Sequence, residues 1–135
     1  MLNSERIGNQ FYQNLGKLFY AIAATDQKVR PSEIKRLRKY VRQFWLDVDA
    51  VDDEVGTDAA YQIEIVFDWL QETDYTGGEV HFNEFKRFYK EHQDKFTSQV
   101  KKLILDTADS IASSFAGKNK SEMLLLQRLK SLFNH

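Results

Sequence analysis

The chain has 135 residues, of which 42% are hydrophobic and 29% are charged, and its formal net charge is −1. This size and composition are usual for one globular domain, and they exclude an intrinsically disordered chain. The absence of cysteine excludes disulfides, thiolate metal sites and cysteine nucleophiles, and the near-neutral charge is unlike that of a general nucleic-acid binder.

The first third of the chain predicts two helices. Apolar residues recur at spacings of three and four over residues 7–24, which is the pattern of an amphipathic helix. A polar break over residues 25–30 separates this helix from the next. Pro31 then stands at the favoured first position of a second helix, whose apolar stripe continues to about Trp45.

The middle of the chain predicts a third and a fourth helix. Thr57 is a candidate N-cap for a helix that extends to about Glu72. Because the apolar residues of this helix face several directions, we expect it to be the central and most buried helix. Gly77-Gly78 then breaks the chain, and a fourth helix follows a short extended piece at residues 79–81.

The last third predicts two further helices. Thr97 caps the fifth helix, which ends at Gly117, and Asn119 with Glu122 forms a capping-box-like start for the sixth. One proline and six glycines are too few turn-forming residues for a β-sandwich or barrel of this length. We therefore expect an all-α fold, a single bundle of about six helices arranged as helix–loop–helix pairs.

A weak internal repeat supports that arrangement. The order helix, short loop, glutamate, helix occurs three times, with the loops and glutamates at residues 26–33, 77–84 and 115–122. Such a repeat predicts helical pairs that pack side by side. No linker or low-complexity stretch divides the chain, so we expect a single domain over residues 1–135.

Charge is unevenly distributed along the chain. Residues 28–42 hold seven basic side chains and one acidic one, Glu33, whereas residues 47–58 hold six acidic side chains and no basic one. The simplest interpretation is a solvated helix face followed by a solvated acidic loop. Alternatively, the basic stretch binds a protein partner or supports self-association, and the acidic stretch binds a cation.

The most specific motif lies between Phe19 and Glu33. A helix that ends in small residues is followed by Asp26, the aliphatic Val29, and Glu33 at the start of the next helix. This arrangement resembles the TerB-like domains of tellurite-resistance proteins, although Gln27 stands where that family usually has glycine. The size and the all-helical layout agree loosely over most of the chain.

The resemblance implies binding rather than catalysis. TerB-like proteins are associated with tellurite resistance and wider bacterial stress responses, and some are thought to bind divalent metal through acidic residues. Carried over to this chain, the resemblance makes Asp26 and Glu33 candidate ligands of a divalent cation, calcium or another. The alternative is that Asp26 closes a turn and Glu33 caps a helix. The second copy of the motif is poor, because Phe115 and Ala116 replace its aspartate and glycine.

No pattern of catalytic residues is visible. The three histidines lack the spacing of di-iron or zinc-protease helices, Gly77-Gly78 is too short for a phosphate-binding loop, and the Gly-x-Ser-x-Gly elbow is missing. We therefore expect a non-enzymatic binding or scaffold domain without catalytic residues. The alternative is a structural protein–protein interaction module that binds no metal and uses the basic second helix and the acidic segment 47–58.

The N-terminal segment predicts the location of the protein. Met1 to Gln10 is polar and lacks the apolar core of a signal peptide, and no stretch approaches the ~18 apolar residues of a membrane span. We expect a cytoplasmic protein with a protein partner or self-association, and without nucleic acid or membrane insertion.

Overall fold

The computed structural model describes residues 2–24, 31–45, 59–73, 78–112 and 120–134, and within these ranges it contains six α-helices and no strand. The predicted all-α fold is therefore confirmed. The helices are α1 (Leu2–Ala23), α2 (Pro31–Tyr40), α4 (Gln62–Thr73), α5 (Gly78–Glu91), α6 (Ser98–Ala112) and α7 (Lys120–Phe133). The shorter helical turns are the π-helix η1 (Val41–Trp45) and the 3-10 helices η2 (Ala59–Tyr61) and η3 (Gln93–Lys95).

Local sequence explains where two of these helices begin. Pro31 is the first residue of α2, where its missing N–H breaks no helical hydrogen bond. Thr97 caps α6 as predicted, because its Oγ1 accepts a hydrogen bond from the backbone N–H of Val100 at 3.2 Å. The predicted cap at Thr57, the helix end at Gly117 and the capping residue Asn119 lie outside the described residues.

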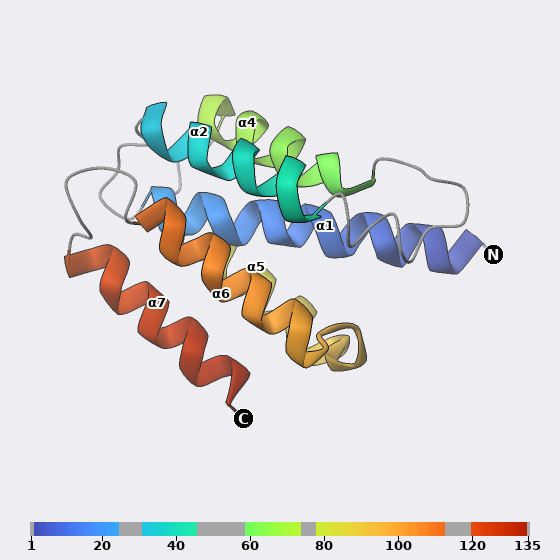
Figure 1. The fold of residues 1–135 in the computed structure, drawn as a ribbon. Coiled ribbons are helices and arrows are strands. Elements are labelled where there is room, and N and C mark those ends of the chain that lie inside the picture. The colour runs from blue at the N-terminus through green and yellow to red at the C-terminus, as the bar shows by residue number, and fades with distance from the viewer. Residues whose placement is uncertain (1, 25–30, 46–58, 74–77, 113–119, 135) are drawn as a thin grey trace.

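Helix α1 lies at the centre of the bundle (Figure 1). Helices α4, α5, α6 and α7 all pack against it. Its inner residues Leu15, Leu18, Phe19 and Ile22 are all 0% exposed. None of the described helices combines the length and the apolar character that crossing a bilayer requires.

Helix α4 is not the central helix, and that prediction is wrong. It buries Ile63, Phe67 and Leu70, but Ile65 and Trp69 are 56% and 61% exposed. The apolar residues that face several directions thus form one buried face and one exposed face. Periodicity does not distinguish an apolar face in the core from one in solvent.

The extended piece predicted at residues 79–81 is also wrong, because α5 already begins at Gly78. This start places Glu84 in the interior of the helix. The repeat therefore holds only in part. Glu33 and Glu122 are the third residues of α2 and α7, and they are 1% and 2% exposed. Glu84 differs because it is the seventh residue of α5.

An aromatic cluster fills the part of the core that joins α1, α5 and α7. At its centre is Phe96, between η3 and α6, which is 4% exposed. The ring centroids of Tyr89, Phe11 and Phe85 lie 4.9, 5.2 and 5.8 Å from that of Phe96. Phe133 of α7 also packs on Tyr89, at 5.2 Å. These contacts join α5 and α7 to each other through their aromatic side chains.

Candidate functional site

The basic stretch of the sequence forms an exposed face of α2 and η1. A shallow hollow of about 540 Å³ on this face is lined by Pro31, Ile34, Lys35, Arg38, Lys39 and Arg42. The four cations surround a small apolar area formed by the other two residues. This arrangement agrees with the sequence-based expectation of a solvent-facing basic helix.

Carboxylates of α4 neutralise two of these four cations. Arg38 donates a hydrogen bond from Nη2 to Asp68 at 2.9 Å, and its Nε lies 3.6 Å from Glu64. The Nε of Arg42 lies 3.7 Å from the second oxygen of Glu64. Burial raises the pKa of the Glu64 carboxyl in spite of the two arginines. Lys35 and Lys39 form no ion pair with any residue in the described ranges.

Two large apolar side chains of α4 are exposed. Ile65 and Trp69 each follow one of the α2-facing carboxylates by one residue, so they lie about 100° further around α4. Both are more than half exposed. We call the surface formed by Lys35, Lys39, Ile65 and Trp69 the α2–α4 face. It combines two cations that form no ion pair within the described ranges with two large apolar side chains in solvent.

The two predicted metal ligands are not brought together within the described part of the chain. Asp26 lies outside the described residues, and so does the acidic segment 47–58. Glu33 lies in the first turn of α2 with its side chain almost fully buried. Among the residues whose positions are described, no three histidine, cysteine, aspartate or glutamate side chains form a group that could hold a metal ion. The cation site stays a prediction of the resemblance.

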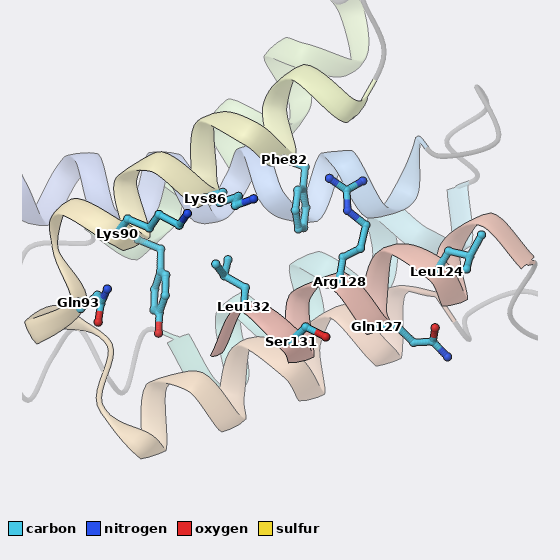
Figure 2. A pocket seen from close by; sticks show the side chains of 10 residues that line it. Phe82, Lys86, Lys90, Gln93, Leu124, Gln127, Arg128, Ser131 and Leu132 are labelled. Atoms are coloured by element: carbon cyan, nitrogen blue, oxygen red, sulfur yellow. The ribbon is translucent and has the colours of Figure 1, made fainter. Parts of the chain in front are cut away.

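A larger hollow of about 770 Å³ opens between α5 and α7, and nothing in the sequence predicted it (Figure 2). Phe82 and Tyr89 of α5 and Leu132 of α7 contribute its apolar surface, and each is at most 8% exposed. Figure 2 shows that the labelled residue numbers rise in the same direction along both helices. We call this hollow the α5–α7 groove.

An ion pair ties the two helices of the groove together. Arg128 of α7 donates two hydrogen bonds to the two carboxylate oxygens of Glu79 on α5, at 2.8 and 2.7 Å. The guanidinium carbon also lies 4.5 Å from the ring centroid of Phe82. The hydrogen bonds from Arg128 lower the pKa of Glu79, and the same bonds raise the pKa of Arg128. Bidentate pairing of this kind fixes geometry as well as charge.

This ion pair predicts a stability difference that depends on pH. Because the pKa of Glu79 lies below its ordinary 4.5 in the folded chain, the carboxylate stabilises the fold above that pH. The stabilisation is lost as the pH falls through the folded-state pKa. We expect Glu79→Gln to lower the free energy of unfolding by about 0.2–1 kcal/mol near pH 7, since the pair is largely exposed. In acid, once Glu79 is protonated, the difference should vanish.

Urea unfolding followed by circular dichroism at about pH 7 and about pH 3 measures this difference. The control is Glu91→Gln, since Glu91 is exposed on the same helix and forms no ion pair with the described residues. An equal loss at both pH values would contradict the role assigned to Glu79.

His81 lies between α5 and α1, and its ring centroid is 5.6 Å from that of Tyr20 on α1. Its side chain is buried, and Nδ1 lies 3.0 Å from Oε1 of Glu84. Lys17 of α1 approaches the other oxygen of Glu84 at 3.6 Å. His92 follows the last residue of α5, and its ring lies 4.5 Å from that of Phe88. Both histidines therefore have packing partners that explain their positions.

Comparisons of the chain with models of protein families, with curated proteins and with solved structures found no match. The fold and the surfaces thus define the class: an all-α helical bundle with a cationic and apolar face and an open groove. The TerB-like resemblance stays a prediction from the motif around Asp26 and Glu33.

Proposed function

We propose that this chain is a non-enzymatic binding domain of the TerB-like kind, and that it docks a protein partner through the α2–α4 face. The observation that supports this most is the exposure of Trp69, at 61%, on a helix whose carboxylates pair with α2. The lysines Lys35 and Lys39 of α2 form no ion pair with any described residue. Large aromatic side chains in solvent that are flanked by charge are typical of protein interfaces, where tryptophan is enriched among the residues that dominate binding energy.

The chemistry of the face indicates the kind of partner. Lys35 and Lys39 favour an acidic surface, which they would attract and orient during encounter. Ile65 and Trp69 favour an apolar patch on the same partner, since burial of these side chains would supply affinity. The TerB-like resemblance would place such a domain in a bacterial stress response of the tellurite-resistance type. Cation binding at Asp26 and Glu33 would be a separate property of the same domain.

Variants of the α2–α4 face test this proposal. We expect Trp69→Ala, and separately Lys35→Glu with Lys39→Glu, to weaken partner binding about tenfold or more. All three positions are exposed, so the variants should keep the stability of the fold within about 0.5 kcal/mol. Lys130→Glu is the matched control, because Lys130 is an exposed cation on α7 that lies outside the α2–α4 face.

The measurement is a pull-down with each variant, followed by calorimetric titration of the purified acidic proteins that the wild type retains. The proposal requires proteins retained by the wild type and by the control but lost from both face variants, with retention falling as salt rises. The same proteins recovered with every variant would overturn it. Repeating the titration with EDTA and then with calcium separates docking from a contribution of the predicted cation site.

A further inference from the structure

We infer that the α5–α7 groove is a second binding site, and that it accepts an acidic amphipathic helix of a partner protein. The groove lies between α5 and α7, which both pack on α1 and meet directly where Phe133 contacts Tyr89. Figure 2 shows Phe82 of α5 directed toward α7, and Arg128 and Leu132 of α7 directed toward α5. A trough between two helices is the usual receptor for the apolar face of a third helix.

The dimensions of the groove suit a short helix. Its lining on α5 extends from Phe82 to Lys90, which at 1.5 Å per residue is about 12 Å, or roughly two helical turns, and Gln93 of η3 continues it. Phe82 and Tyr89 are seven residues apart and lie on the same face, about 10 Å from each other along the helix axis. Apolar residues at positions i, i+3 or i+4, and i+7 of a bound helix have the same repeat.

The apolar surface continues to the mouth of the groove. Leu124 of α7 lines it and is 54% exposed, so this leucine is apolar surface that an occupant would cover. Gln93 and Gln127 provide amides at the rim that can bond to polar groups of a peptide.

The charge of the groove selects an acidic occupant. Its ionisable lining residues other than Tyr89 are Lys86, Lys90 and Arg128, and none of the described residues that line it is acidic. Arg128 is already neutralised by Glu79, but Lys86 and Lys90 form no ion pair with described residues. These two lysines are four residues apart on one helix face, where like charges repel each other. A carboxylate between them would relieve that repulsion and fix the register of a bound helix.

The test uses a fluorescein-labelled, hydrocarbon-stapled helix of 14 residues with leucines at i, i+3 and i+7 and glutamates on the flanks. We expect it to bind the full chain in fluorescence anisotropy and to shift amide NMR signals of α5 and α7. The double variant Lys86→Glu with Lys90→Glu, which we call the rim variant, should weaken binding at least tenfold. Lys35→Glu with Lys39→Glu on the α2–α4 face should leave the affinity unchanged.

Several outcomes would overturn this inference. They are no binding of the stapled helix, equal binding of a lysine-flanked or sequence-scrambled control peptide, or equal binding by the rim variant. Thermal unfolding of the rim variant shows whether its fold is intact, and Leu124→Glu, at an exposed position, provides a second variant that should weaken binding. Sedimentation of the chain with phosphatidylglycerol vesicles, lost on rim reversal in the absence of peptide binding, would assign the groove to a lipid surface instead.

Discussion

Replacement of Trp45 by alanine should lower the free energy of unfolding by about 3–5 kcal/mol. Trp45 is 0% exposed at the end of η1, and its ring packs against Tyr12 and Phe19 of α1, with centroids 6.5 and 6.3 Å away. Its indole Nε1 donates a hydrogen bond to Thr107 of α6 at 3.1 Å. One side chain thus joins three elements, and its removal leaves a cavity that backbone relaxation fills only in part.

The expected loss is a large share of the roughly 5–15 kcal/mol that stabilises a domain of this kind. Urea unfolding followed by circular dichroism measures it. Trp69→Ala is the matched control, since the same chemical change at a side chain 61% exposed should cost only about 0.5 kcal/mol. Similar losses at the two tryptophans would contradict the burial of Trp45.

A double-mutant cycle separates the hydrogen bond from the packing. Thr107→Val leaves the buried indole N–H of Trp45 without its partner and should cost about 1–3 kcal/mol. In a Trp45→Phe background the same change should cost less, because the unsatisfied donor is then gone. Part of the cost should persist in both backgrounds, since Thr107 also donates to the Leu103 carbonyl at 2.7 Å.

The features of the fold that the sequence predicted correctly depend on residues close together in the chain. The start of α2 at Pro31 and the cap of α6 at Thr97 depend on one or two neighbouring residues, so the pattern alone locates them. The all-α class follows from the same signals added over the whole chain. The prediction of an extended piece at residues 79–81 was wrong because a glycine pair suggests a break in the chain. In the structure Gly78 packs closely on α1, and α5 begins at this residue.

The surfaces with functional interest could not be predicted, because they depend on residues far apart in the chain. The pair Glu79–Arg128 spans 49 residues, and the α5–α7 groove exists only because both helices pack on a third. The apolar side chains of Ile65 and Trp69 were attributed to a central helix. Periodicity gives the faces of a helix but not their partners, so an apolar face that binds another protein resembles a face in the core.

The central position of α1 depends on Gly16 and Gly78, whose close contacts with neighbouring helices the sequence pattern does not reveal. A Cβ on Gly16 would lie 2.8 Å from the carbonyl oxygen of Ile63 and 3.0 Å from Cβ of Val66, both on α4. A Cβ on Gly78 would lie 2.8 Å from the carbonyl oxygen of Ala21 on α1. Glycine inside a helix is unfavourable by up to about 1 kcal/mol relative to alanine, so its presence in α1 requires a compensating gain. Close packing of the α1 and α4 backbones provides that gain.

We therefore expect Gly16→Ala to destabilise the domain by about 1–2 kcal/mol, since an overpacking cost of about 1–3 kcal/mol exceeds the gain in helix propensity. Gly16→Val should cost more, because its branched Cβ adds two methyl groups beside the Ile63 carbonyl. Val66→Ala should rescue Gly16→Ala only in part, since the closest atom to the new methyl group belongs to the backbone and cannot move away alone. Urea unfolding of the three variants gives these values. If Gly16→Ala were as stable as the wild type, close approach to α4 would not be the reason for glycine at this position.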